Sequence, residues 1–217
     1  MNLFIDNAFV GVIAVGMTFV IISGGIDLSV GSVVAFVGVL AAKLIFVYHF
    51  HPLTAFLFCL LLGAIFGFVM GSLIHFFELP PFLVTLVGMF LARGGAFLVS
   101  LNAIPIKHDF IYDLLDIGIP LGFRVRMPLT AIIFILCVLV GIYILRFTKF
   151  GRVTYAIGSS EPSAVLMGLP VGRTKILIYT LSGILSALGG IVYSIYTSSG
   201  YPLACVGLEL DVIASVV

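Results

Sequence analysis

The sequence predicts an all-α polytopic membrane protein with about six to seven transmembrane helices. Hydrophobic residues make up 62% of the 217-residue chain and charged residues only 9%. Soluble globular chains carry roughly 25% charged residues. The hydrophobic residues also gather in runs of about 17–24, long enough for a helix to cross a hydrocarbon core of roughly 30 Å. Composition and run length therefore both indicate a membrane-spanning helical fold.

Six candidate spans follow from these runs, at approximately 8–24, 29–48, 53–76, 82–100, 127–146 and 177–197. The first run lacks a basic segment before it, so we interpret it as a span and not as a signal peptide. The tail, residues 198–217, becomes hydrophobic again after "SSGYP" and reads as the start of a seventh span. We treat 1–217 as a single transmembrane domain.

The loops predict the orientation of the spans. Loop 146–175 carries five Lys and Arg residues, whereas loop 101–126 carries three. Cytoplasmic loops are enriched in these residues, which places 146–175 in the cytoplasm and 101–126 outside. Counting spans backwards then places 77–82 in the cytoplasm and 48–52 outside.

A short helix is predicted within the cytoplasmic loop, in "SSEPSAVLMGLP" at 159–170. Ser159 or Ser160 can cap its first turn, and Pro162 suits an early helical position. Gly168 offers a left-handed end, and Pro170 prevents continuation. Such a helix is too short to span a bilayer. It either rests on lipid headgroups or docks a cytoplasmic protein, and both interpretations stay open.

The stretch "SGGIDLSVGS" at 23–32 interrupts two hydrophobic runs. Gly24 and Gly25 permit a left-handed turn or unwound backbone, and Asp27 can cap the next helix, with Ser29 in its first turn. Gly31 belongs to the same stretch. The stretch is either a tight cytoplasmic turn or a broken helix whose exposed backbone lines a substrate path.

Arg93 is the one basic residue deep inside a hydrophobic run, in "VTLVGMFLARGGAFLVS". Charges within a membrane are costly, so we expect its side chain to face the helix bundle or a water-filled cavity. Either a structural pairing or a place near a transport pathway fits this pattern. Glu78, before "LPPF", is interpreted as a turn residue at the interface.

The chain shows no motif for covalent chemistry. It has no nucleophile elbow, P-loop, dinucleotide fingerprint or metal-binding spacing of its four His and three Cys residues. We therefore predict no catalytic residue, no metal and no cofactor in this chain, and its net charge of +1 argues against nucleic acid as a partner. If the chain moves a solute uphill, the energy is expected to come from a partner.

Four motifs resemble the permease subunits of bacterial ABC sugar importers of the ribose, xylose and galactose type. They are "GGIDLSVGS", "PPFLVTLVGMFLARG", "RVTYAIGSSEPSAVLMGL" and "LSGILSALGGIVYS", and the resemblance covers the whole chain. Residues 101–116 and 195–217 look most like a permease of the galactofuranose importer.

The resemblance implies a transport subunit without its own ATPase site. ATP and Mg would be bound by a cytoplasmic ABC ATPase subunit. A second permease subunit, identical or different, and a periplasmic sugar-binding protein would complete the importer in the lipid of the bacterial inner membrane. Loop 146–175 would be the coupling loop that docks on the ATPase. The residues expected to carry that role are Ala156, Gly158, Ser160, Glu161, Pro162, Ser163, Ala164, Met167 and Gly168.

The sequence departs from the family pattern in two respects. Ser160 stands where the family usually has Asn, which is also a good helix cap, and Ser163 and Leu169 differ as well. Family members have roughly ten spans of about 20 residues each, so we expect this chain to be a truncated part of a roughly ten-span permease. A gradient-driven transporter with Asp27 as its coupling acid is the second hypothesis. A membrane enzyme is the third.

Overall fold

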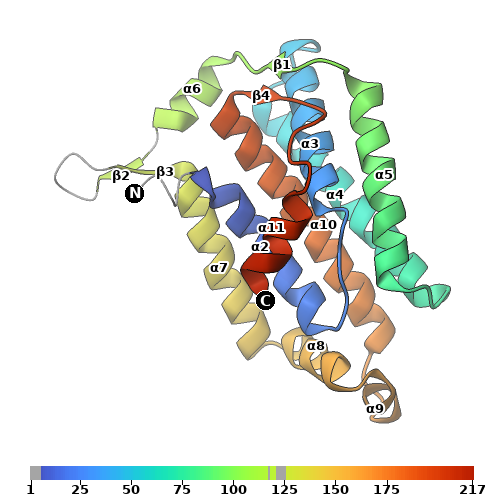
Figure 1. The fold of residues 1–217 in the computed structure, drawn as a ribbon. Helices are drawn as coiled ribbons and strands as arrows, with labels where there is room; N and C mark the ends of the chain where they lie inside the picture. The colour runs from blue at the N-terminus through green and yellow to red at the C-terminus, as the bar shows by residue number, and fades with distance from the viewer. Residues whose placement is uncertain (1–5, 117, 121–125) are drawn as a thin grey trace.

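The computed structural model describes residues 6–116, 118–120 and 126–217 (Figure 1). The helices are α2 (Ala8–Ile22), α3 (Val30–Phe46), α4 (Pro52–Phe76), α5 (Pro81–Val99), α6 (Asp109–Asp116), α7 (Leu129–Phe147), α8 (Lys149–Ser159), α9 (Glu161–Leu166), α10 (Val171–Thr197) and α11 (Leu208–Val216). The strands are β1 (Ile104–Pro105), β2 (Gly118–Pro120), β3 (Arg126–Pro128) and β4 (Ser199–Gly200). They form two antiparallel pairs, β1 with β4 and β2 with β3.

The six predicted spans all form helices, and the fold is all-α as expected. Within the described residues, α4, α5, α7 and α10 are long and hydrophobic enough to cross a membrane. At 15 and 17 residues, α2 and α3 are shorter than the roughly 20 residues that a full span needs. The tail after β4 forms the nine-residue helix α11.

Helix α10 lies at the centre of the bundle, and 61% of its most hydrophobic window is buried. It packs against α2, α3 and α4, while α5 lies outside α3 and α7 lies outside α2 (Figure 1). The corresponding windows of α5 and α7 are 28% and 17% buried. Because one long helix touches three others, side chains on α10 can connect segments that are distant in the sequence.

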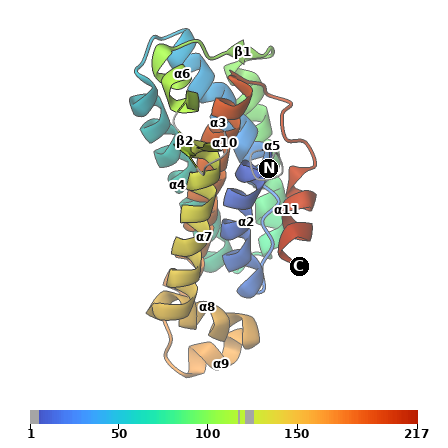
Figure 2. The same cartoon turned by 90° about the vertical axis from the view of Figure 1, so that its left-hand side faces the viewer.

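The two ends of the bundle contain different loops. Helices α8 and α9 lie at one end, and α6 with β1 lies at the other (Figure 2). The turn between α4 and α5 shares a groove with α9, so it lies at the α9 end. The rings of His51 and His108 lie 5.8 Å apart between centroids, so loops 48–52 and 101–108 share the opposite end. This arrangement agrees with the predicted alternation of the loops.

The outward faces of α4, α5 and α7 are hydrophobic and exposed. Examples are Leu57, Phe68, Leu91, Leu98 and Leu139, each with about half or more of its surface accessible. In water such a band would be an unusually large hydrophobic patch. In a bilayer these side chains contact lipid, as expected for membrane-spanning helices.

Candidate functional site

The connection between α2 and α3, residues 23–29, has an irregular backbone between two hydrophobic helices. Helix α2 ends where Gly24 adopts a left-handed φ of 80°. The Gly24 N–H donates to the Ile21 carbonyl at 2.9 Å, and the Gly25 N–H donates to the Val20 carbonyl at 3.0 Å. These two bonds satisfy carbonyls at the helix end that would otherwise lack partners. Helix α2 therefore ends at the Gly-Gly pair, where the sequence predicts a left-handed turn or unwound backbone.

Asp27 is the polar centre of this connection and is only 1% exposed. Its Oδ1 accepts hydrogen bonds from the Ser29 N–H at 2.9 Å and the Ser29 hydroxyl at 2.7 Å. Its Oδ2 accepts a hydrogen bond from the Ser182 hydroxyl at 2.7 Å. The residue at the N-cap position is Ser29. Asp27 therefore does not occupy the predicted cap position, because its side chain closes a turn two residues earlier.

The Asp27–Ser182 hydrogen bond shows where the connection lies along the bundle. Ser182 is eleven residues into α10, about 16 Å from the start of that helix at 1.5 Å per residue. The connection rises beside α10 between the end of α2 and the start of α3 (Figure 1). Asp27 therefore lies well along the bundle from the start of α10, whereas Ile22, just before the connection, lies beside Gly158 of α8. Irregular backbone at this depth needs protein or water beside it, and α10 supplies the protein.

Arg93 joins α5 to the segment that follows β4. Its Nη1 donates to the carbonyls of Pro202 and Ala204, each at 2.8 Å. The guanidinium also interacts electrostatically with Glu209 on α11. The structure therefore shows a structural pairing of Arg93, and the acceptors are backbone carbonyl oxygens.

Glu209 lies against the start of α3. A side chain added at Gly31 would meet the Glu209 carboxylate at 2.6 Å and the Cys205 carbonyl at 2.8 Å. The start of a helix carries partial positive charge from its unpaired N–H groups. The carboxylates of Asp27 and Glu209 both lie near this charge. Gly31 thus leaves room for the 201–209 segment to approach α3. Helices α2 and α3 with the connection 23–29 between them are called the broken span below.

The predicted short helix is α9, with the predicted boundaries. The Ser160 hydroxyl accepts a hydrogen bond from the Ser163 N–H at 3.4 Å and caps the helix, and Pro162 follows in the first turn. Gly168 has a φ of 71°, and its N–H donates to the Val165 carbonyl at 2.9 Å. Both sequence signals for this helix are confirmed.

Helix α9 has one buried and one exposed side. Ala164 is fully buried against Val153, Ile157 and Val171. On the other side Val165, Leu166 and Met167 are 57%, 89% and 66% exposed. Glu161 forms an ion pair with Lys175 at 2.5 Å, which ties α9 to α10. The helix thus presents a hydrophobic tip at one end of the molecule.

A groove lies beside α9, between it and the turn that joins α4 to α5. Its volume is about 1120 Å³. Its lining includes His75, Glu78, Leu79, Glu161, Leu166 and Arg173. Glu78 is an exposed turn residue with a φ of 50°, as its sequence context predicts. The groove is wide enough to receive side chains of another protein.

Helix α8, which the sequence analysis did not separate from the loop, links α9 to the broken span. Gly158 near its end lies against the Ile22 carbonyl, so a side chain there would collide with the end of α2. Ser160 ends α8 and caps α9, so the two helices share one residue. Helix α9 is thus joined to α8 through Ser160, and α8 contacts the end of α2 five residues before Asp27.

The family model for the "branched-chain amino acid transport system / permease component" matches residues 1–217. The chain belongs to this permease family. It is 50% identical over 220 residues to the inner membrane ABC transporter permease protein YjfF of Escherichia coli K12. It is 43% identical over 229 residues to the fructose import permease protein FruG of Bifidobacterium longum. It is 37% identical over 221 residues to the ribose import permease protein RbsC of E. coli K12.

All of this chain is covered in each of these comparisons. The chain spans 65% of the length of YjfF and of FruG, and 67% of RbsC. No solved structure matches it. With the spans described above, family membership makes this chain a multi-pass inner-membrane protein.

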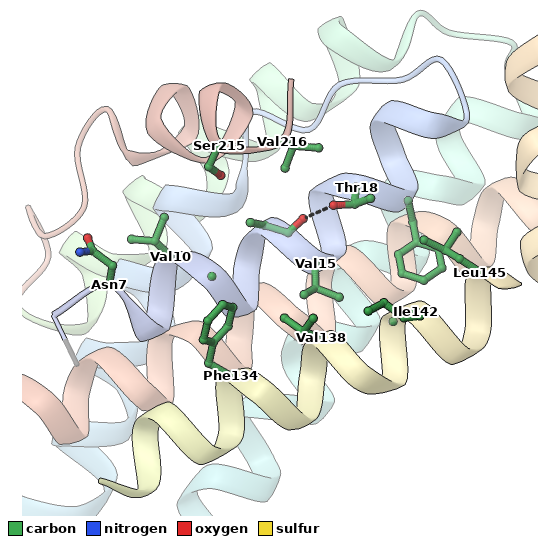
Figure 3. A pocket seen from close by; sticks show the side chains of 14 residues that line it. Asn7, Val10, Val15, Thr18, Phe134, Val138, Ile142, Leu145, Ser215 and Val216 are labelled. Carbon is green, nitrogen blue, oxygen red and sulfur yellow. Dashed lines mark hydrogen bonds between the residues drawn. The ribbon is translucent and has the colours of Figure 1, made fainter. Parts of the chain in front are cut away.

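A second pocket of the permease lies between α2, α7 and α11 and has a volume of about 550 Å³. Figure 3 shows Phe134 and Val138 of α7 facing α2 across it. The hydroxyls of Thr18 and Ser215 face this region but bond to carbonyls of their own helices. None of the residues predicted as functional is among the 14 that line it. Its surface is mostly hydrophobic, which suits lipid or another helix better than a sugar.

The sequence analysis missed a row of glycines that places α10 in the permease. Gly63, Gly67 and Gly71 recur at every fourth residue of α4, on one face of the helix. A side chain at Gly67 would collide with the Tyr179 carbonyl, and one at Gly63 would meet Ala187 and Gly183 of α10. Spacing of this kind is a known signal for close helix approach in membranes and could have been read from the sequence.

Proposed function

We propose that this chain forms the transmembrane part of a permease subunit in an ATP-driven monosaccharide importer. The observation that carries the proposal is α9, a capped helix outside the spans with an exposed hydrophobic tip and a direct connection through α8 to the broken span. Its partner is a cytoplasmic ABC ATPase, which binds ATP and Mg. A second permease subunit and a periplasmic sugar-binding protein complete the assembly.

The cargo class follows from the relatives. FruG and RbsC are named as fructose and ribose import permeases, and we propose a monosaccharide as the cargo of this chain as well. Galactofuranose is the finer proposal, because residues 101–116 and 195–217 look most like a galactofuranose importer. Competition of labelled galactofuranose uptake by unlabelled galactofuranose, ribose, fructose and galactose tests it. Absence of specific galactofuranose uptake, or equal inhibition of that uptake by ribose or fructose, would reject it.

The proposed mechanism needs no covalent step in this chain. Closure of the ATPase moves α9, and α9 moves α8. Because Gly158 lies against the Ile22 carbonyl, that motion reaches the end of α2. The segment 23–29 then shifts against α10 and changes which side of the bundle is open. The binding protein supplies specificity, so the membrane path needs only weak contacts with the sugar.

The charges inside the described bundle favour a neutral cargo. Asp27 is engaged by Ser29 and Ser182, and Arg93 is engaged by two carbonyls. A charged solute would require further groups to compensate it. The rival is a gradient-driven transporter, favoured only by the deep position of Asp27. In that case Asp27→Asn would abolish proton-coupled uptake, whereas an ATP-driven importer would keep its dependence on ATP.

The experiment that tests the proposal is co-purification of the full-length protein with the ABC ATPase encoded beside it. Leu166→Glu places a charge on the exposed tip of α9, and Leu166→Met keeps the tip hydrophobic as the matched control. We expect at least tenfold weaker binding for the glutamate variant, since a central hydrophobic contact of an interface is lost. Equal binding by both variants would reject α9 as the docking element. Failure of the wild-type protein to bind would reject the ATP-driven function.

A further inference from the structure

Three hydroxyl groups share one face of α10. Tyr179, Ser182 and Ser186 stand at positions i, i+3 and i+7, which fall on the same side of a helix. They are 2%, 1% and 1% exposed, so all three are buried. Two of them face the 23–29 segment, since the Ser182 hydroxyl bonds to Asp27 and the Tyr179 hydroxyl lies against Gly25. Ser186 continues the row one turn further along α10.

Only the middle hydroxyl of the row has a hydrogen bond. Among the residues that the structure describes, neither the Tyr179 hydroxyl nor the Ser186 hydroxyl has a partner. Other hydroxyls on α10 bond back to their own helix, as Thr180 does to the Ile176 carbonyl at 2.8 Å. A buried hydroxyl without a bond lowers stability. Two such groups beside the one that Asp27 uses call for an explanation.

The Tyr179 hydroxyl is within reach of a small movement of Asp27. Tyr179 and Ser182 are three residues apart, about 4.5 Å along the helix axis. Gly25 lies over the Tyr179 hydroxyl and Asp27 lies over Ser182, so both residues face α10 two positions apart. A shift of the segment towards the start of α10 would bring the Asp27 carboxylate over Tyr179.

The segment has the freedom for such a shift. Gly24 has no neighbour within 4 Å of a would-be side chain, and Gly25 packs closely on the Tyr179 hydroxyl because it has no side chain of its own. Ile26 is 41% exposed and is not part of the packed core. The lower end of the segment touches α8 at Gly158. One-turn steps of one element along another are a known form of two-state transition.

We propose that Tyr179 is the alternate hydrogen-bond partner of Asp27, used when the 23–29 segment steps along α10 during transport. This inference rests on the proposed function, because the α8–α9 unit would drive the step. In either position Asp27 keeps one hydroxyl donor from α10, while Ser186 and one of the other two hydroxyls in the row lack a hydrogen bond. The two positions are therefore close in free energy, and a modest push can select between them.

A double-mutant cycle tests the pairing without any need for transport. The free full-length protein in detergent is compared with Ser182→Ala, Tyr179→Phe and the double variant by thermal unfolding. If Asp27 turns to Tyr179 when Ser182 is absent, Ser182→Ala alone lowers Tm little and Tyr179→Phe alone does not lower it. The double variant then unfolds roughly 3 °C or more below the sum of the two single shifts.

Ser186→Ala is the matched control, because it removes the same kind of unpartnered buried hydroxyl on the far side of Ser182. Its combination with Ser182→Ala is expected to be additive. An additive cycle for Ser182 and Tyr179 would overturn the inference. ATP-dependent sugar uptake by the wild-type importer is measured separately, and Tyr179→Phe should lower it at least tenfold while Ser186→Ala leaves it unchanged. Absence of wild-type uptake would reject the proposed function and leave the result of the cycle standing.

Discussion

The Asp27 carboxylate accepts a hydrogen bond from the Ser182 hydroxyl at 2.7 Å, across 155 positions of the chain. This bond joins the broken span to the central helix, and both residues are only 1% exposed. A buried carboxylate without partners is costly, so the bond both satisfies the charge and fixes the segment in place. This contact therefore contributes to the stability of the bundle and is the one that the proposed motion exchanges.

The Asp27 contacts predict a graded response to substitution. Asp27→Ala leaves the Ser29 and Ser182 donors without their acceptor and is expected to lower the free energy of unfolding by about 2–4 kcal/mol. Asp27→Asn keeps an acceptor oxygen for Ser29 and is expected to cost less than half as much. Thermal unfolding in detergent measures both. Equal melting temperatures for the wild-type and alanine proteins would show that the contact is not structural.

Substitution by alanine is expected to have opposite effects on stability at Gly67 and Gly94. Gly67 lies at the close crossing of α4 and α10, whereas Gly94 lies on an open face of α5. At Gly67→Ala the new methyl group collides with the Tyr179 carbonyl, so the helices must separate. We expect a loss of about 1–3 kcal/mol, as for overpacked cores. At Gly94→Ala nothing lies within 4 Å, and the higher helix propensity of alanine is expected to add about 0.5–1 kcal/mol. Melting temperatures that move in the same direction would contradict the crossing geometry.

Arg93 predicts how firmly the segment after β4 is attached. Arg93→Met removes both hydrogen bonds to the carbonyls of Pro202 and Ala204. Residues 201–207 should then exchange their amide hydrogens at least tenfold faster, while α4 and α10 exchange as before. Arg93→Lys keeps the charge but not the planar fork, so its exchange should be intermediate. Hydrogen exchange with mass spectrometry measures these rates, and unchanged exchange in the methionine variant would refute the anchoring role.

Substitution of Gly168 is expected to strain the backbone without creating a steric clash. Its φ of 71° favours glycine, yet nothing lies within 4 Å of a would-be side chain. Gly168→Val should therefore cost about 1–2 kcal/mol locally and misplace α9, whereas Gly168→Asn should be tolerated because Asn accepts left-handed backbone. Binding of the ABC ATPase to each variant checks this. Equal loss of binding in both variants would point to a side-chain contact instead.

Much of the fold could be predicted because its signals are local. The hydrophobic runs predict every long helix, although α10 begins at Val171, six residues before the predicted start, because its first turns carry Arg173 and Lys175. The caps at Ser160 and Gly168 marked α9, since both are properties of a single turn. The end of α2 at Gly24 is a signal of the same kind.

The site could be predicted only in part, because its contacts join distant segments. The Gly-Gly pair predicts where the helical backbone is interrupted, but it leaves open whether the interruption is a tight turn or a broken helix. The hydrogen bond between Asp27 and Ser182 shows that Asp27 lies beside α10, and the sequence does not reveal this contact. The spacing of Asp27 predicts a helix cap, but Asp27 instead accepts hydrogen bonds from the N–H and hydroxyl of Ser29 and closes a tighter turn before α3. Helix α8 was missed because its mixed polar sequence resembles the rest of the basic loop.

The central claim is that α8 transmits the motion of α9 to the broken span, and Gly158 tests it most directly. Gly158→Ala places a methyl group against the Ile22 carbonyl and should separate α8 from α2. In the full-length importer reconstituted with its ATPase, we expect ATPase binding to persist and ATP-dependent sugar uptake to fall at least tenfold, while the Gly94→Ala control transports normally. Wild-type uptake by the Gly158→Ala protein would contradict this account.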